Sequence, residues 1–184
     1  MKLRRKHGFV AIIGIAAIIG TALLVVPALA TPPQGVASTI FAVGHFADIN
    51  STTKTALNPS TSGSSDNEKK FWQARIETKG LSDVYVLQNT IAPGGTFGWH
   101  SHPGPSLVIV KSGTGTFYEA NDPTCSPHVV QAGSGFVDNG NDTHVVRNEG
   151  SVDLVTVVTS IVPAGFQRRI DQPAPTNCPK LPNG

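Results

Sequence analysis

The chain has 184 residues, a formal net charge of +2 and 14% charged residues, against about 25% in an average soluble domain. This balance excludes the strongly basic class of nucleic-acid-binding proteins. The two cysteines exclude a miniprotein held together by several disulfides. The 19 glycines and 14 prolines interrupt the chain too often for a long helical or coiled-coil protein. The composition therefore predicts a loop-rich, all-β protein with one domain.

Residues 1–30 have the layout of an export signal. Four basic residues lie within the first six positions, an apolar run follows over residues 8–26, and Ala28-Leu29-Ala30 offers the small residues of a cleavage site. The apolar run is close to the lower length limit of a membrane span, so an uncleaved anchor is the alternative. Cleavage would remove four basic residues and no acidic one, which changes the net charge from +2 to −2. We expect a signal peptide and a secreted or cell-surface protein.

Cys125 and Cys178 both lie in polar sequences with flanking prolines, Asp-Pro-Thr-Cys-Ser-Pro and Asn-Cys-Pro. In an oxidising compartment we expect them to form a disulfide. Two free thiols are the alternative, whereas a metal site on these cysteines lacks a further Cys or His at a suitable spacing. The disulfide would attach the C-terminal tail to the domain.

The rest of the chain divides by composition. Residues 31–70 are expected as an extended and loop segment, with a first strand within residues 40–49 and a long polar surface loop over residues 50–67. Residues 71–163 hold most of the strand-like runs, and residues 164–184 form a proline-rich tail.

The strand-like runs begin at Phe71–Glu77, where apolar and polar residues alternate as in a half-buried strand. Later runs recur about every 8–12 residues, which is typical of a β-sandwich or barrel. The two runs around Ser112-Gly113 are expected to pair as a hairpin. No window keeps a helical period free of Gly and Pro. The later runs cover residues 84–91, 107–110, 114–118, 129–130, 135–137, 144–147 and 154–162.

His100 and His102 are separated by one residue. On a strand, residues i and i+2 point to the same face. Two imidazoles on one face can bind one cation, and neutral imidazole suits Zn, Cu, Fe and Ni. For this short motif alone, two surface or core histidines remain the alternative.

A longer pattern surrounds these two histidines. From Gly94 the chain has five residues, then His100, one residue, His102, three residues, Ser106, six residues and Gly113. The pattern resembles the first sequence motif of the cupin family, in which a glutamate stands at the position of Ser106.

A second pattern begins at Gly133. Five residues separate it from Asn139, after which come one residue, Asn141, two residues, His144, three residues and Asn148. It resembles the second cupin motif, with asparagines in place of a proline and a glycine. The sequences Trp-His-Ser-His-Pro-Gly-Pro, Asp-Pro-Thr-Cys and Asn-Cys-Pro are also similar to those of single-domain, exported bacterial cupins.

The resemblance covers residues 71–163 and implies a small jelly-roll β-barrel of antiparallel strands. It implies that His100, His102 and His144 bind a divalent transition metal in the barrel, with Fe, Zn, Cu, Ni and Mn all open. Because the glutamate is missing, we expect a neutral three-histidine site. Its binding of hard cations such as Mn should be weakened most.

Four further residues lie close to these motifs. Trp99 and Ser106 are candidate pocket residues, and core packing is the other role open to Trp99. Asp138 and Asp142 flank the second motif in a turn rich in Gly and Asn. We expect them to serve turn geometry, and an approach of either one to the barrel mouth is the alternative.

Two functions are compatible with this site, so whether the protein is an enzyme stays open. One is metal-dependent chemistry on a small molecule, with a dioxygenase favoured over an isomerase because O₂ needs vacant positions on a redox metal. The other is a non-catalytic module that binds a small molecule or sugar, because no acid/base residue is evident near the histidines. The expected partner is a small-molecule ligand or substrate and not nucleic acid. A homodimer is compatible with the sequence, and membrane contact would require the uncleaved signal.

Overall fold

The computed structural model describes residues 30–57 and 71–178. The predicted export signal lies outside these residues, except for Ala30. The described part of the chain is built from strands without a helix, so it holds no helix able to cross a membrane. The strands are β1 (Gln34–Phe46), β2 (Asn50–Ala56), β3 (Phe71–Glu77), β4 (Ser82–Thr96), β5 (His100–Ser101), β6 (Ser106–Ser112), β7 (Thr114–Glu119), β8 (His128–Gln131), β9 (Gly135–Asp138), β10 (His144–Arg147), β11 (Leu154–Pro163) and β12 (Ile170–Asp171).

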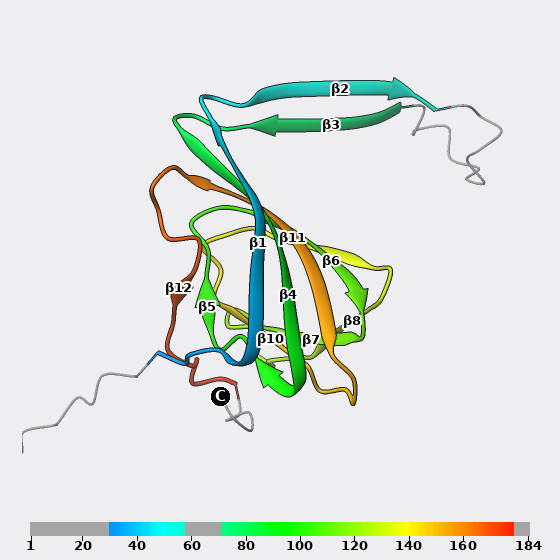
Figure 1. Ribbon diagram of the computed structural model, residues 1–184, viewed down its shortest axis with the longest axis vertical. Coiled ribbons are helices and arrows are strands. Elements are labelled where there is room, and N and C mark those ends of the chain that lie inside the picture. The colour runs from blue at the N-terminus through cyan, green and yellow to red at the C-terminus, as the bar shows by residue number, and fades with distance from the viewer. Residues whose placement is uncertain (1–29, 58–70, 179–184) are drawn as a thin grey trace, which may run out of the picture.

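Ten of these strands form one sheet that curls into a nearly closed barrel (Figure 1). The long strand β4 pairs with β1 along one edge and with β11 along the other. β11 pairs onward with β6, and β6 with β9. β10 pairs with β5 and β7, and β7 with β8. Every pairing is antiparallel, which confirms the predicted all-β, jelly-roll barrel.

β2 and β3 form a separate two-stranded ribbon that extends beyond the barrel (Figure 1). Residues 50–56 therefore correct the expectation of a surface loop that begins at Asn50. The reason is that this polar segment contains three threonines, whose branched side chains suit a strand. β3 is a strand as predicted. Phe71 and Trp72 are about half exposed, however, so the alternation of apolar and polar residues does not correspond to one buried face of this strand.

β6 and β7 do not pair as the predicted hairpin. β6 lies between β11 and β9, whereas β7 lies between β10 and β8. Gly113 separates them with a φ of 78°, and a Cβ at this position would lie 2.5 Å from the Asp153 carbonyl oxygen. The short turn signal therefore marks a crossing from one part of the barrel wall to another.

The barrel interior has an apolar part and a polar part. Ile91, Val110, Val146 and Leu154 form the apolar cluster. On β11 the inward-facing positions also include two polar residues, and Ser160 shares a 2.8 Å hydrogen bond with Ser106. Buried polar side chains need such partners, and these two serines satisfy each other inside the barrel.

Asn148, the last residue of the second sequence pattern, fastens the end of β10. Its side-chain Nδ2 donates hydrogen bonds to the carbonyl oxygens of Ile91 at 2.8 Å and Val152 at 2.7 Å. Its Oδ1 accepts one from the Gly150 backbone N–H at 3.0 Å. The side chain is buried with all three groups satisfied, which explains why an amide suits this position.

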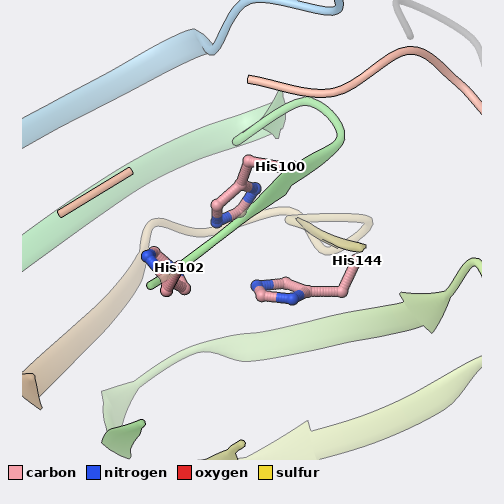
Figure 2. A group of neighbouring side chains, drawn as sticks. All are labelled: His100, His102 and His144. Carbon is pink, nitrogen blue, oxygen red and sulfur yellow. The ribbon is translucent and has the colours of Figure 1, made fainter. Parts of the chain in front are cut away.

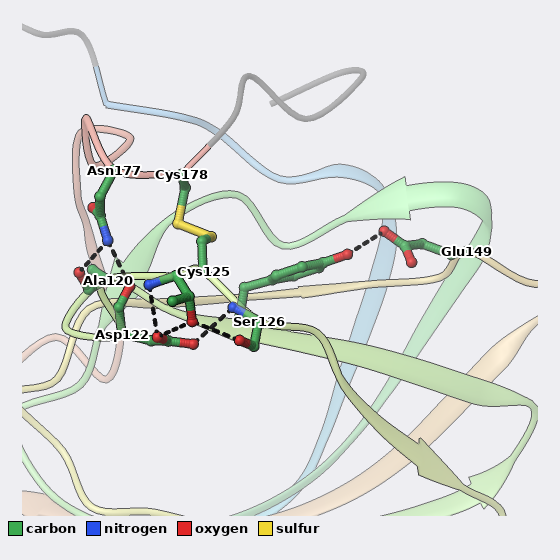
Figure 3. Close-up of a disulfide and its surroundings, with 9 residues drawn as sticks. Ala120, Asp122, Cys125, Ser126, Glu149, Asn177 and Cys178 are labelled. Atoms are coloured by element: carbon green, nitrogen blue, oxygen red, sulfur yellow. Dashed lines mark hydrogen bonds between the residues drawn. A yellow bond between two sulfur atoms is a disulfide. The ribbon is translucent and has the colours of Figure 1, made fainter.

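The predicted disulfide between Cys125 and Cys178 is present and closes a separation of 53 residues (Figure 3). Both cysteines are buried together with Trp99, Tyr118 and Val145. Asn177 adds hydrogen bonds to the carbonyl oxygens of Ala120 and Asp122. The C-terminal tail is thus attached to the outer side of β10 and β7.

The carboxylate of Asp122 organises the loop before Cys125 (Figure 3). It accepts hydrogen bonds from the backbone N–H groups of Ser126 at 2.7 Å and Thr124 at 2.9 Å, and from the Thr124 hydroxyl. These bonds, that of Ser126 first, lower the pKa of Asp122 well below its usual range. The loop thereby fixes the position of Cys125, which forms the disulfide with Cys178 of the C-terminal tail.

Removal of the disulfide should lower stability. Replacing both Cys125 and Cys178 by Ser should reduce the free energy of unfolding by about 4 kcal/mol, because the unfolded chain loses a long covalent loop. Urea denaturation of the oxidised and reduced protein measures this difference. The double variant is the matched control, because a reductant should not change its stability. Equal stability of the oxidised and reduced wild-type protein would contradict the prediction.

Candidate metal centre

Three buried histidines meet at the polar end of the barrel. His100 is the first residue of β5 and His144 the first of β10, and the two stand directly opposite each other in the antiparallel register. His102 follows β5 by one residue. All three are less than a tenth exposed. The structure therefore brings together the three residues that the sequence patterns selected.

The imidazoles face one another across a small space (Figure 2). One ring nitrogen from each histidine can be chosen so that all three lie within 4.8 Å of one another. Such a cluster suits a metal ion, because three imidazole nitrogens at this separation can share one cation.

The second nitrogen of each ring has a backbone partner. Nδ1 of His100 lies 2.8 Å from the Gly98 carbonyl oxygen, Nδ1 of His102 lies 2.6 Å from that of Arg168, and Nδ1 of His144 lies 3.1 Å from that of Asp142. A carbonyl oxygen can only accept, so each Nδ1 carries the hydrogen. In the neutral ring, Nε2 then holds a lone pair. Metal-binding histidines are commonly oriented in this way.

Burial keeps these rings neutral. It lowers the pKa of His100 well below the usual value, and nearby His144 and Arg169 add to this effect. It lowers the pKa of His102 to about 4. It also lowers the pKa of His144, although the charge of Asp138 opposes the shift. Neutral imidazoles are the form that binds metals.

Asp138 belongs to the site. The sequence favoured a turn role for it and left open an approach to the barrel mouth. It is the last residue of β9, 5% exposed, and its Oδ2 lies 3.3 Å from Nε2 of His102 and 3.7 Å from Nε2 of His144. Its other oxygen, Oδ1, accepts a hydrogen bond from the Gly140 N–H at 3.0 Å, which is the turn role that we expected. Asp138 reaches the histidines because β9 pairs with β6. The spacing of residues along the sequence does not reveal this pairing.

Two arginines were also missed. Arg168 and Arg169 come from the segment after β11, which the sequence marked only as a tail, and both line the cavity beside the histidines. Nη2 of Arg169 donates to the Phe97 carbonyl oxygen, and its Nε pairs with Asp171. Burial lowers the pKa of both guanidinium groups.

The two candidate pocket residues have different positions. Ser106 is buried and lines the cavity. Trp99 instead packs against the disulfide on the outer side of the barrel wall. The reason is strand alternation: His100 points inward, so the preceding side chain points the other way.

The cavity around the histidines has a volume of about 50 Å³. This is room for a cation with a few waters or for a small ligand. Its wall combines the polar groups above with apolar side chains. The lining residues are Asn89, Phe97, His100, His102, Ser106, Val108, Phe136, Asp138, His144, Val146, Thr156, Val158, Arg168 and Arg169.

Residues 88–160 match a family model described as a cupin domain. This segment is a cupin domain. It contains the three histidines, Ser106 and Asp138, and the antiparallel barrel agrees with the fold that the sequence motifs implied. No curated protein matches the chain.

The cupin domain also resembles several solved structures. A cupin-like protein from Thermotoga maritima is 21% identical, with 52% of this chain and 79% of that chain covered and a TM-score of 0.43. A predicted oxalate decarboxylase from the same organism is 19% identical, with 46% and 83% covered and a TM-score of 0.37. An oxalate oxidase is 27% identical, with 44% and 46% covered and a TM-score of 0.38. The chain thus spans less than half of that oxalate oxidase.

The metal-free cupin should become less stable in mild acid. The unfolded chain binds protons at its histidines near pH 6.5, whereas the folded chain keeps His102 neutral down to a pKa of about 4. The unfolded state therefore binds more protons in this window, and the free energy of unfolding falls as the pH falls, by up to about 1.4 kcal/mol per pH unit for each such histidine. Urea denaturation between pH 7.5 and 4.5 measures the slope.

The control for this slope is His102→Gln, which removes one of the buried titrating groups. We expect a shallower loss of stability below pH 6.5 in this variant. An unchanged slope would show that His102 does not contribute.

Proposed function

We propose that this protein is exported, binds a divalent transition metal through His100, His102 and His144, and acts on a small molecule at that metal in a dioxygenase-like reaction. The observation that carries the proposal is the shared orientation of the three rings. Each Nδ1 is occupied by a backbone carbonyl, and each Nε2 is left to bind a cation.

The donor set fits a transition metal. Imidazole nitrogen is the ligand that Zn, Cu, Fe and Ni share, and three protein ligands leave coordination positions for water, O₂ or substrate. When bound, a redox-active metal would supply electron transfer to O₂, which no side chain in the site can supply. The chain itself orients the ligands and limits access of bulk water, since all three rings are buried.

The cavity wall favours a small anionic molecule. Arg168 and Arg169 both line it, and guanidinium groups bind carboxylates and phosphates through paired hydrogen bonds. The cavity volume of about 50 Å³ limits the part of a substrate that can enter. A small carboxylate-bearing or phenolate molecule therefore suits the site better than a neutral sugar.

Two independent features support export. An intramolecular disulfide such as Cys125–Cys178 is more usual in oxidising compartments than in the cytosol. The first 30 residues combine a basic start, an apolar run and an Ala-Leu-Ala sequence, as signal peptides do.

Protein purified from its exported state should contain about one equivalent of a transition metal. Elemental analysis identifies the metal, and His100→Ala, His102→Ala and His144→Ala should each reduce its content, because each removes one of three ligands. His128→Ala is the matched control, since this histidine lies at the start of β8 and is exposed. Metal-free wild-type protein, or unchanged metal content in all three variants, would contradict the proposal.

Oxygen uptake tests the reaction. We expect O₂ consumption with small phenols, thiols or carboxylates that is lost on chelation and restored by the native metal. A redox-inert metal together with no turnover would contradict the dioxygenase hypothesis. Thermal stabilisation by a small molecule with and without metal would then favour the non-catalytic binding module.

A further inference from the structure

We propose that Asp138 supplies the carboxylate ligand of this metal site. It would replace the glutamate of the first cupin motif, at whose position this chain has Ser106. The inference rests on the proposed metal binding at the three histidines. It changes the site from three neutral imidazoles to three imidazoles and one carboxylate.

Strand pairing puts Asp138 beside the position of the missing glutamate. Ser106 of β6 stands opposite Asp138 of β9 in the antiparallel register. Directly opposite residues point to the same face and have Cβ atoms about 4.5–5.5 Å apart. Both side chains are buried at the cavity wall. A carboxylate on β9 therefore enters the same part of the barrel as one on the neighbouring strand would.

The carboxylate is oriented toward the histidines. Oδ1 is held by the Gly140 N–H, in a turn where Gly140 has a φ of 79° and a Cβ would lie 2.7 Å from the Gly104 backbone. Oδ2 is buried and has no hydrogen-bond partner among the described residues. It instead points at Nε2 of His102 and Nε2 of His144, at 3.3 and 3.7 Å.

These distances have the size of ligand-to-ligand separations around a metal. Two ligands about 2.1 Å from a tetrahedral ion lie about 3.4 Å apart. The distance from Oδ2 to Nε2 of His102, 3.3 Å, is slightly shorter than this value, and the distance to Nε2 of His144, 3.7 Å, is slightly longer. Oδ2 is thus placed as a neighbour of Nε2 of His102 and Nε2 of His144.

The arrangement needs a cation between its atoms. With the ring hydrogens on Nδ1, the Nε2 lone pairs of His102 and His144 face the lone pairs of a carboxylate oxygen. Acceptors that face each other in a buried site repel, and no protein hydrogen lies between them. One proton could bridge Oδ2 to one of the two rings only, whereas a metal ion can contact all of these atoms at once.

A carboxylate ligand also changes which metals the site should retain. Oxygen ligands suit harder ions such as Mn²⁺ and Fe²⁺ better than imidazole alone does. We therefore revise the sequence expectation that hard cations are weakened by the absent glutamate.

The test compares the metal-free full chain in three forms: wild type, Asp138→Asn and Asp153→Asn. The last variant removes an exposed carboxylate in the loop before β11 and is the matched charge control. Titration calorimetry with Zn²⁺ and Mn²⁺ should show affinity reduced by about tenfold to a hundredfold or more in Asp138→Asn, with the larger loss for Mn²⁺. Asp153→Asn should bind as the wild type does.

A second measurement separates a ligand from a structural residue. Without metal, the amide of Asp138→Asn can donate its N–H to an Nε2 lone pair while its oxygen still accepts from Gly140. The metal-free variant should therefore melt at a higher temperature than metal-free wild type, and Zn²⁺ should raise its melting temperature less. A residue that served the turn alone would leave metal affinity unchanged.

The outcomes distinguish the two proposals. If wild type and Asp138→Asn bind both metals equally well, or if the metal-free variant melts below wild type, the assignment of Asp138 is overturned while the three-histidine site stands. If wild-type protein binds neither metal, the proposed function fails and this inference fails with it.

Discussion

Two antiparallel pairings position the site: His100 opposite His144, and Ser106 opposite Asp138. Opposite residues in such a pair share a face of the sheet, so each pairing delivers two side chains to the same side of the barrel wall. A slip of one residue in either pairing would turn those side chains to the outer surface. The geometry of the candidate metal site thus depends on the register of these short strands. β4 and β11 form the neighbouring barrel wall, and the Asn148 side chain fixes the end of β10.

The barrel separates two kinds of interior. Ile91, Val110 and Leu154 supply apolar burial that stabilises the fold. The histidines, Asp138 and the hydroxyls of Ser106 and Ser160 collect at the other end, where burial costs free energy unless each polar atom has a partner. Backbone carbonyls accept the hydrogens of the Nδ1 atoms, whereas Nε2 of His102 and Nε2 of His144 lie beside another acceptor, Oδ2 of Asp138. This imbalance at one end of a well-packed barrel is characteristic of a binding site.

The sequence predicted those features that depend on local spacing or on paired cysteines. The His-x-His motif, His144 and the Cys125–Cys178 disulfide were all visible as residue patterns. What it missed depends on topology. The proximity of Asp138 to His102 follows from β9 lying beside β6, and the β6–β7 hairpin was wrong because a turn signal does not tell a reversal from a crossing. The boundaries of the predicted domains and the roles of the site residues stay predictions.

The carbonyl that orients His102 comes from Arg168, 66 residues further along the chain. This carbonyl, both cavity arginines and Cys178 lie outside residues 88–160, which match the cupin family. A fragment limited to residues 88–160 would contain all three imidazoles. It would lack the Arg168 carbonyl that orients His102, and it would lack Cys178, the disulfide partner of Cys125. The smallest unit able to orient all three histidines is therefore longer than the segment that matches the family.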